Sequence, residues 1–535
     1  MSALPSILRP RGGKLDAKGL RLYCEQRVAQ AEAAQLIEPL LDLVEQLSER
    51  LLLTELRLGR VLKAQFGRRS EHLDPSQLQL ALAGLDCVPP EVQALLTPEP
   101  PNPETQPRPR KPSRLRPPRQ IPESVPRRLT MSDPTPAQMC CAECGTQKSY
   151  IGSDFAEMLD WEPGGFFVER TERRKFACRP CQGGVVIGQG PARPLEQAMP
   201  GPGLVAQVIV AKYKDHCPLE RQSRIYTERY GVPLSPSTLD DWVGGAAQVL
   251  QPVAMQILQQ IVSGSHISLD DTPVRVLDPQ AAHGVKRGHI WSLVGQGAVA
   301  YLYTPSWSGK PIRELLSEFE GLLQSDGYAG LQKLFENRDK APRRAGCMAH
   351  ARRRFVQALE AGEARAAVPL TLIKKLYEIE RRATQDGVDA QERQVRRQAD
   401  SRPLMEQLHK VLLALQAQAP PKTPMGKAVG YALRQWETLQ PFLSDGQVRI
   451  DNNHTEQTLR PIALGRKNWL FGGSDRGANW LAIHQTLLGS CALAGITDPW
   501  TYLRDVLTKL ARGWPQSRLG ELVPTAWLAA QATAG

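Results

Sequence analysis

Residues 266–271 read HISLDD, a run of β-forming residues that ends on two carboxylates. Two more strand-like runs and an amphipathic helical pattern follow it, namely GHIWSLV (288–294), AVAYLYT (298–304) and KPIRELLSEFE (310–320). A fourth strand is then predicted in GLLQSDGYAG, residues 321–330, ending at Asp326. The order of three strands, a helix and a fourth strand predicts a mixed α/β core whose first part covers residues 262–350.

Two aspartates end the first and fourth of these strands. If the fourth strand lies parallel beside the first, the carboxylates of Asp270 and Asp326 emerge close together, which is the ribonuclease-H-like arrangement. Adjacent carboxylates repel each other, and a hard divalent cation with oxygen ligands relieves that repulsion. A strand-end aspartate taken alone is more often a turn or cap residue, so the prediction depends on the order of the elements.

A third carboxylate, Glu456, lies in DNNHTEQTLRPIALGRKNWLFGGSDRG, residues 451–477. Three residues could cap a helix here, namely Asp451, Asn452 and Asn453. Glu456 would then project from an early helical turn towards the two aspartates, within a segment, 448–490, that completes the core. Two Mg²⁺ ions, or Mn²⁺, about 3.5–4 Å apart could be held by Asp270, Asp326 and Glu456 for displacement at phosphorus.

Basic residues and glycines surround the glutamate. Arg460 lies one helical turn after Glu456, and Arg466 and Lys467 follow beyond Pro461, so we expect these three to hold a DNA backbone. The glycines of FGGSDRG would let the backbone approach a phosphate closely. The alternative is that Arg460 only pairs with a carboxylate and the glycines only turn the chain.

A long interval separates Asp326 from Glu456. Residues 351–447 read mostly as helices, which predicts a helical insertion in the catalytic core. Its first helix carries Arg352 and Arg353 in CMAHARRRF, and these side chains could contact DNA phosphates or form an ordinary solvated face.

The segments before the core differ in composition. Residues 30–67 carry a heptad-like apolar pattern, which indicates a coiled coil or a single amphipathic helix. Residues 68–138 form a basic, proline-rich linker that could track DNA or act as a spacer. Residues 200–255 are helical and fit a helix-turn-helix or a helical hairpin without a DNA role. Residues 491–535 form a C-terminal helical segment.

Two C-x-x-C knuckles lie at 139–185, in CCAECG and FACRPCQGG. Four thiolates, from Cys141, Cys144, Cys178 and Cys181, suit one tetrahedral structural Zn²⁺. Cys140 could replace Cys141 as a ligand. A redox dithiol would explain one knuckle but not two, so this segment is predicted to be a zinc-ribbon-like, or zinc-finger-like, module.

The composition of the whole chain points to a polyanionic partner. The 535 residues carry a net charge of +12 with a pI near 9.2, and Lys and Arg displace the counterions condensed on nucleic acid. No apolar run approaches the roughly 20 residues that cross a bilayer, and no signal peptide is evident, so we expect no membrane partner and a cytoplasmic location. Ten cysteines are too sparse for a disulfide scaffold.

Several motifs resemble the transposases of the insertion sequence sixty-six family, a DDE type. They are FGRRSEHLD, RRKFACRPC, KYKDHCPLERQSRIY, LDDTPVRVLDP, QSDGYAGL, CMAHARRRF, the stretch at 451–477 and AGITDPWTYL. The resemblance implies Asp270, Asp326 and Glu456 as the metal-binding triad. This chain departs from the family pattern with Asp271 in place of glutamate, Gln457 in place of arginine and Met348 in place of tryptophan. Strand alternation lets only one of Asp270 and Asp271 face the metal.

The resemblance implies a bacterial DNA transposase that is cytoplasmic and associated with the nucleoid. It would hydrolyse double-stranded DNA at element ends and join the freed 3′-hydroxyl to target DNA, as a homo-oligomer and with helper proteins from the same element where these are needed. One alternative is a non-catalytic, zinc-containing DNA-binding regulator derived from a transposase. A simple nuclease with the same core is another alternative, since hydrolysis and strand transfer share one metal site.

Overall fold

The structure is a computed structural model that describes residues 121–180, 183–196, 198–336 and 341–534. The chain divides into two units, 1–115 and 116–535, and all the described residues belong to the second. The predicted coiled coil at 30–67 and most of the predicted linker therefore lie outside the described residues. Within the described part, no helix is both long and apolar enough to cross a membrane.

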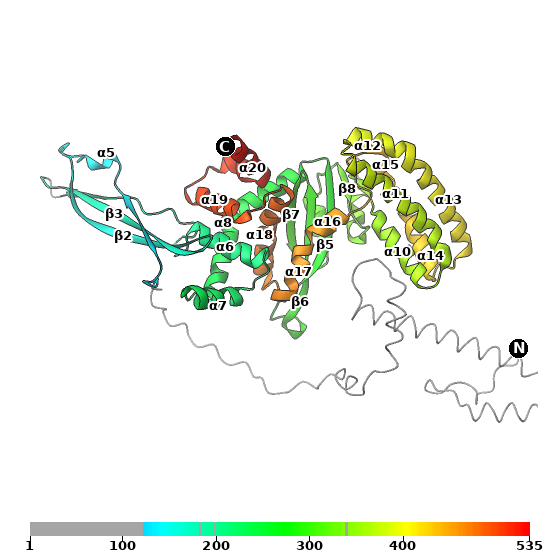
Figure 1. Ribbon diagram of the computed structural model, residues 1–535, viewed down its shortest axis with the longest axis horizontal. Helices are drawn as coiled ribbons and strands as arrows, with labels where there is room; N and C mark the ends of the chain where they lie inside the picture. The colour runs from blue at the N-terminus through cyan, green and yellow to red at the C-terminus, as the bar shows by residue number, and fades with distance from the viewer. Residues whose placement is uncertain (1–120, 181–182, 197, 337–340, 535) are drawn as a thin grey trace, which may run out of the picture. The chain divides into compact units, whose positions relative to one another are not determined.

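The first sheet forms an arm, a name used here for its four strands. The strands are β1 (Arg127–Ser132), β2 (Ser149–Glu162), β3 (Gly165–Cys178) and β4 (Gly183–Ile187), with the short helix α5 (Pro136–Met139) between β1 and β2. The order is β1-β3-β2, with β4 also paired to β3. Strand β1 lies within the segment that the sequence predicted as a linker. Strands β2 and β3 each hold 14 residues, so their hairpin reaches about 45 Å at roughly 3.3 Å per residue (Figure 1).

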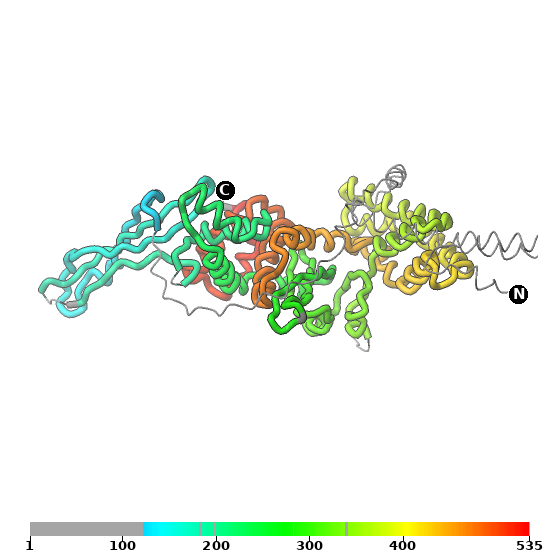
Figure 2. Tube along the Cα trace, turned by 90° about the horizontal axis from the view of Figure 1, so that it is seen from below, coloured from blue at the N-terminus to red at the C-terminus, as the bar shows by residue number. Residues whose placement is uncertain are grey.

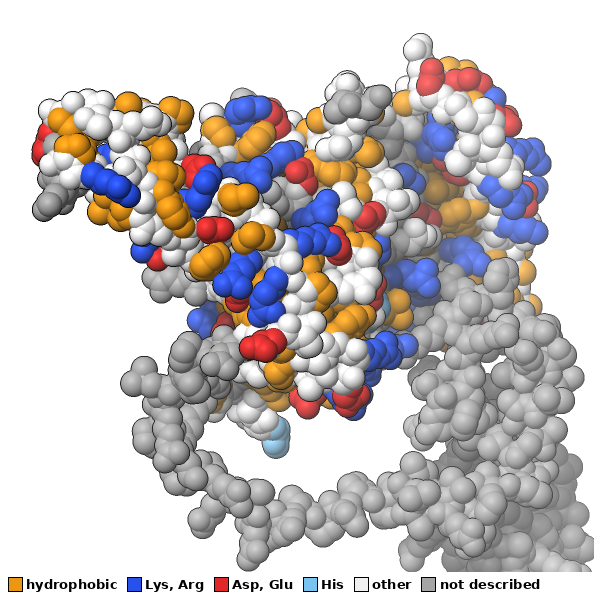
Figure 3. All heavy atoms as spheres, turned by 60° about the vertical axis from the view of Figure 1, so that its left-hand side comes forward, with side chains coloured by type: hydrophobic (Ala, Val, Ile, Leu, Met, Phe, Trp, Pro, Cys, Tyr) orange, Lys and Arg blue, Asp and Glu red, His pale blue; other side chains and the backbone are white. Residues whose placement is uncertain are grey.

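One face of the arm exposes apolar side chains. Met131 and Phe155 flank Glu172 in one row of the sheet, and both are more than half exposed. The guanidinium of Arg170 lies 4.4 Å from the centre of the Phe155 ring. Figure 3 shows hydrophobic side chains of the arm beside lysine or arginine side chains. The surface of the arm therefore combines apolar side chains with ion pairs, such as Arg170–Glu157 and Lys175–Asp154.

The turn end of the hairpin is fixed to the rest of the chain. The Asp160 carboxylate, on β2, accepts hydrogen bonds from the backbone N–H of Trp161 at 2.8 Å and of Leu204 at 2.6 Å. Leu204 lies in the first turn of α6 (Pro202–Tyr213), so Asp160 caps this helix from a distant strand. Burial raises the pKa of Asp160 to about 6. A Cβ on Gly201 would come within 2.3 Å of Asp160, so only glycine fits there.

Two further helices follow α6, as the sequence predicted. Helix α7 (Leu219–Tyr230) ends at Gly231, which takes the left-handed conformation with φ of 65°. Helix α8 (Pro236–Val262) begins after Ser235, whose hydroxyl accepts from the Thr238 N–H at 3.3 Å. The two helices pack against each other and form part of the main hydrophobic core.

A five-stranded mixed sheet lies at the centre of that core. Its elements are β5 (His266–Leu277), β6 (Val285–Gly295), β7 (Ala298–Thr304), α9 (Lys310–Leu315), β8 (Leu322–Gln324) and β9 (Arg343–Ala345). The order is β7-β6-β5-β8-β9, with β5 to β7 antiparallel and β5, β8 and β9 parallel. The prediction that the fourth strand lies parallel beside the first is therefore confirmed. Strand β8 ends two residues earlier than expected.

The open edge of β7 is covered by α18 (Asp475–Leu493). The Thr486 hydroxyl accepts from the Tyr301 N–H at 2.9 Å. The Ser490 hydroxyl accepts from the Val299 N–H at 3.1 Å and donates to the Val299 carbonyl at 2.8 Å. An uncovered strand edge invites pairing with other chains, so these two hydroxyls complete the sheet where a further strand would otherwise pair.

The interval between Asp326 and Glu456 is mostly helical, as predicted. It contains α10 (Met348–Glu360), α11 (Ala367–Gln385), α12 (Ala390–Arg396), α13 (Arg402–Gln418), α14 (Pro424–Arg434) and α15 (Pro441–Ser444). These helices have their own hydrophobic core, which reaches the sheet at Leu322 and Ala345. Figures 1 and 2 show them grouped beside the β8 side of the sheet.

The chain then returns from the insertion to the sheet, as Figure 2 shows. The returning helices are α16 (Asn453–Thr458), α17 (Arg460–Trp469), α18, α19 (Pro499–Ala511) and α20 (Pro524–Ala534). The Thr458 hydroxyl bonds the Ser292 hydroxyl at 2.7 Å, and its carbonyl accepts from the Tyr301 hydroxyl at 2.5 Å. Helix α16 is thereby held against β6 and β7.

Helix α18 also carries a histidine that is buried in the core. The Nε2 atom of His484 lies 2.9 Å from the Val243 carbonyl, and the ring stacks on Tyr213 with 5.1 Å between centres. Its Nδ1 atom is buried and has no hydrogen-bond partner among the described residues. Burial therefore lowers the pKa of His484 from its ordinary 6.5 to about 4.

We predict that His484 makes the fold sensitive to acid. Its folded pKa lies below its unfolded pKa, so its contribution is complete above pH 6.5 and is lost as the pH falls towards 4. The loss amounts to about 3 kcal/mol. His484→Gln should lower Tm at neutral pH yet flatten the fall in Tm between about pH 7 and about pH 4.5, measured by calorimetry. Equal falls in both proteins would contradict this assignment.

Candidate functional site

The two predicted aspartates occupy equivalent places on neighbouring strands. Ser268 on β5 pairs with Gln324 on β8, and these strands are parallel. Asp270 and Asp326 each lie two residues further along. Equal spacing from a paired position places both residues at the same edge of the sheet. The sequence therefore located the two aspartates correctly relative to each other.

Asp270 lies in a strongly electronegative setting. Burial raises the pKa of its carboxyl to about 7, the Asp271 N–H opposes the shift, and the charges of Asp326 and Glu456 add to it. Near neutral pH the ionised form is therefore only about half populated without a counter-charge. A divalent cation with oxygen ligands would favour the ionised form, so this donor set suits Mg²⁺ or Mn²⁺.

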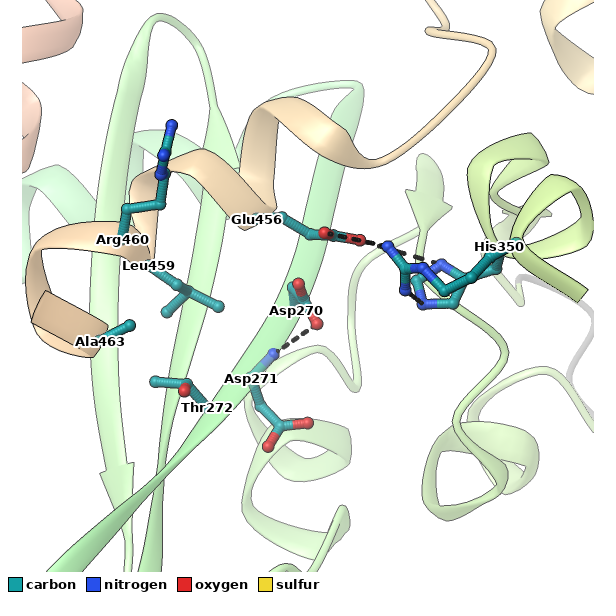
Figure 4. Close-up of a pocket in the computed structure, with 9 residues that line it drawn as sticks. Asp270, Asp271, Thr272, His350, Glu456, Leu459, Arg460 and Ala463 are labelled. Carbon is teal, nitrogen blue, oxygen red and sulfur yellow. Dashed lines mark hydrogen bonds and ion pairs between the residues drawn. The ribbon is translucent and has the colours of Figure 1, made fainter. Parts of the chain in front are cut away.

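Asp271 points away from this group, as Figure 4 shows. One of its oxygens lies 2.5 Å from Nδ1 of His289, and the other accepts from the Trp307 indole N–H at 3.2 Å. Asp270 instead faces the side on which Glu456 lies (Figure 4). The alternation of side chains along β5 thus separates the two neighbours, and the geometry favours Asp270 as the residue beside Glu456.

Glu456 projects from α16 towards Asp270 and towards helix α10. Its Oε1 lies 3.9 Å from Nδ1 of His350, and its Oε2 lies 3.9 Å from the Arg353 guanidinium (Figure 4). Both Oε1 of Glu456 and Nδ1 of His350 are buried without a hydrogen-bond partner among the described residues. Sequence reasoning missed His350. The signal was its spacing from Arg353, which puts both side chains on one face of a helix.

A hollow of about 270 Å³ lies over these groups. Its lining residues are Asp270, Asp271, Thr272, His350, Arg353, Glu456, Leu459, Arg460 and Ala463. Asp326 is not among them, although its charge acts on Asp270. The hollow therefore combines acidic and basic side chains, which suits a phosphodiester that is bound together with a cation.

Two buried amides hold the segments of the site together. The side-chain N–H of Asn452 donates to the Leu269 carbonyl at 2.9 Å, and its backbone N–H donates to the Cys347 sulfur at 3.2 Å. The Gln324 amide donates to the carbonyls of Gly346 at 3.0 Å and Arg449 at 2.8 Å. Asn452, one of three residues predicted as possible caps, occupies the N-cap position, but its side chain forms no cap and instead joins α16 to β5.

The predicted phosphate contacts after Glu456 have different surroundings. Arg460 begins α17, because the helix is interrupted at Leu459, and its guanidinium points away from Asp270 (Figure 4). Arg466 donates to the Pro273 carbonyl on β5, whereas Lys467 is exposed. Pro461 lies in the first turn of α17 and does not end a helix.

The glycines of this stretch approach a strand. The Gly472 N–H donates to the Arg275 carbonyl at 2.8 Å, and the Gly473 carbonyl accepts from the Leu277 N–H at 2.8 Å. Gly473 has a φ of 78°, which favours glycine. Close backbone approach to β5 therefore accounts for both glycines.

The arginines of α10 also differ from one another. Arg353 lines the hollow beside Glu456. The charge of Arg352 acts on Tyr377, a residue of the insertion. Of the two predicted DNA contacts on this helix, Arg353 is the one that the structure brings to the carboxylates.

Three of the predicted zinc ligands meet at the free end of the arm. The sulfurs of Cys141, Cys144 and Cys178 lie within 4.8 Å of one another, and no other group of three or more His, Cys, Asp or Glu side chains in the described residues is as close. The N–H groups of Cys144 and Glu143 lower the pKa of the Cys141 thiol. Cys140 is exposed and outside the cluster, and Cys181 lies outside the described residues. The geometry therefore favours Cys141 over Cys140.

Three family descriptions match successive parts of the chain. Residues 197–480 match the transposase IS66 family. Residues 138–182 match the zinc-finger binding domain of transposase IS66, and residues 486–525 match the IS66 C-terminal element. The second match and the cluster of three thiols together support a structural zinc site.

Similar full-length proteins occur in Sinorhizobium fredii. The uncharacterized protein y4jD is 33% identical over 509 residues, which cover 91% of this chain and 97% of that protein. The uncharacterized protein y4hP is 34% identical over 437 residues, which cover 77% of each chain. The similarity thus extends over most of both sequences.

We predict that zinc depends on the clustered thiols. Wild-type protein should contain about one zinc per chain by elemental analysis, and Cys178→Ser should lose it and unfold the arm's free end. Cys140→Ser is the matched control, because this neighbouring thiol lies outside the cluster. Stoichiometric zinc in the double variant Cys178→Ser, Cys181→Ser would refute the site.

We also predict that Asn452 stabilises the fold through its side chain. Asn452→Ala removes the donor to Leu269 and should lower the free energy of unfolding by about 1–3 kcal/mol, measured by denaturant titration. Asn453→Ala is the control, because the Asn453 amide bonds only the nearby Asp451 at 2.8 Å. Equal destabilisation by the two substitutions would show that the Asn452 bond has no special role.

Proposed function

The chain belongs to the IS66 family of transposases, and we propose that it is an active DNA transposase that cuts and joins phosphodiesters at Asp270, Asp326 and Glu456. The observation that carries the proposal is the equivalent placement of Asp270 and Asp326, each two residues beyond a paired position of the parallel strands β5 and β8, with Glu456 facing Asp270 from α16. We further propose that the sheet and α16 form a ribonuclease-H-like core, on the support of the strand order β7-β6-β5-β8-β9.

The carboxylates would hold one or two Mg²⁺ or Mn²⁺ ions. These residues fit such ions, because the pKa of Asp270 is raised by burial and by its acidic neighbours, and Oε1 of Glu456 has no hydrogen-bond partner among the described residues. When bound, the metal would activate the attacking water or 3′-hydroxyl and stabilise the leaving oxygen. Sulfur and nitrogen ligands are few here, which favours a hard cation over zinc.

The neighbouring basic residues would position DNA. Arg353 and Arg460 line the hollow, and Lys467 extends an exposed cation from the same segment of chain. Arg352 and Arg466 are proposed as weaker contacts, since packing already accounts for part of each side chain. Together these residues would neutralise phosphates without reading the base sequence.

The arm and the oligomer would hold the double-stranded element ends and the target DNA in position. The arm with its cysteine cluster exposes apolar side chains and charges of both signs, a surface that suits a second copy of the chain or, through its arginines, DNA. Strand transfer of paired ends implies a homo-oligomer, with helper proteins of the same element as further partners. A DNA-binding regulator without catalysis would not need three carboxylates in this arrangement, so the transposase is the better supported function.

The triad can be tested with isosteric substitutions. Asp270→Asn, Asp326→Asn and Glu456→Gln should each reduce cleavage and joining of labelled element ends in Mg²⁺ by more than about 100-fold, because each removes a metal ligand rather than an outer-shell partner. DNA affinity should change little, since binding depends mostly on phosphate contacts.

Glu437→Gln is the matched control, because this exposed carboxylate lies in the insertion. Asp271→Asn should be milder than Asp270→Asn, since Asp271 points away from Glu456. Full joining by any of the three triad variants would disprove its assignment. Cleavage without joining by the wild-type protein would instead identify a nuclease.

A further inference from the structure

An exposed tryptophan lies beside the carboxylates and has no part in the function proposed so far. Trp307 follows β7 in the chain and is 57% exposed. Its ring stacks with His289 at 5.5 Å between centres and an interplanar angle of 10°. It also stacks with Tyr328 at 4.7 Å and 21°. Single exposed apolar side chains are common, but this indole is distinguished by two stacked neighbours that leave one aromatic surface open to solvent.

The indole is held in place by polar contacts as well. Its N–H donates to the Asp271 carboxylate at 3.2 Å, and its backbone carbonyl accepts from the Tyr328 hydroxyl at 2.7 Å. Asp271 in turn bonds His289, which is almost fully buried. Trp307 is therefore preorganised, and binding a ligand would cost little loss of side-chain freedom.

The same contacts connect the indole to both aspartates of the proposed triad. Asp271 directly follows Asp270 in β5, and the Tyr328 N–H donates to the Asp326 carboxylate at 3.1 Å. The aromatic group thus begins within two residues of each aspartate. Trp307 does not line the hollow itself, but its contacts place the exposed ring near the strand ends that carry the two aspartates, where DNA leaving the hollow could reach it.

We propose that Trp307 is a stacking platform for an unpaired nucleobase of the DNA strand next to the reacting phosphodiester. This inference rests on the proposed function. A flat, preorganised aromatic ring beside a phosphate-binding site suits a base, because every base presents an aromatic face and the stacking tolerates any sequence. In a continuous duplex both faces of each base are already stacked, so the platform favours DNA with unpaired nucleotides at the element end.

The test compares two labelled DNAs with the full-length protein in Ca²⁺, used in place of Mg²⁺ to slow the reaction. One DNA is a blunt element end, and the other carries four unpaired nucleotides there, with 2-aminopurine as the first. Trp307→Ala should weaken binding of the second DNA by about tenfold and leave the blunt end unchanged. It should also abolish the quenching of 2-aminopurine fluorescence, whereas Trp307→Phe should retain most of both effects.

Phe155→Ala is the control, because it removes another exposed aromatic ring from the arm. A general DNA contact there would shift both affinities and leave their ratio unchanged. If Trp307→Ala leaves both the Tm and the ratio of the affinities for the two DNAs unchanged, the proposal is overturned. A change confined to the oligomeric state would also overturn it, since that would make the ring a protein contact.

The experiments distinguish failure of the proposed function from failure of this inference. If the wild-type protein joins ends in Mg²⁺ while Trp307→Ala keeps the wild-type ratio, the platform is wrong and the transposase stands. If the wild-type protein neither cleaves nor joins while the ratio still depends on Trp307, the platform stands as a DNA-binding site and the catalytic proposal fails.

Discussion

The buried amide of Asn452 is the contact on which the geometry of the site depends. It joins α16 to the Leu269 carbonyl, directly before Asp270, while its backbone N–H reaches the sulfur of Cys347 at the start of α10. Three distant segments thus meet at one fully buried residue. Leaving the side-chain N–H unpaired there would cost more free energy than its hydrogen bond contributes, whereas the Oδ1 atom of the same amide has no hydrogen-bond partner among the described residues. Gln324 acts in the same way one strand away, ahead of Asp326.

The fixed geometry has an electrostatic cost at Asp270. Burial raises the pKa of Asp270 to about 7, and the charges of Asp326, Glu456 and Asp271 add to the shift. A fold under selection for stability alone would separate or replace these acids. Such local strain is common where a protein binds a cation, because the ion restores the balance of charge. His350 and Arg353 each have a nitrogen 3.9 Å from an oxygen of the Glu456 carboxylate.

Sequence reasoning succeeded where local pattern determines structure. Runs of β-forming residues predicted the strands, the order of the elements predicted the parallel pairing of β5 and β8, and the two C-x-x-C motifs predicted the cysteine cluster. It failed for contacts between distant residues. Asparagine is a residue type that often caps helices. The hydrogen bond from Asn452 to the carbonyl of Leu269, 183 residues earlier, can be seen only in the folded structure. The group formed by His289, Trp307 and Asp271 was missed for the same reason, since no spacing in the chain relates them.

The insertion between Asp326 and Glu456 has a consequence for the order of events during synthesis. The two residues are separated by 129 others, and Tyr431, within that interval, donates to the Asp326 carbonyl at 3.1 Å. A ribosome adding about 5–20 residues per second completes Glu456 roughly ten seconds after Asp326. A nascent chain therefore contains strands β5 to β9 before it contains Glu456. The helical insertion thus delays completion of the proposed catalytic centre until 456 of the 535 residues have been made.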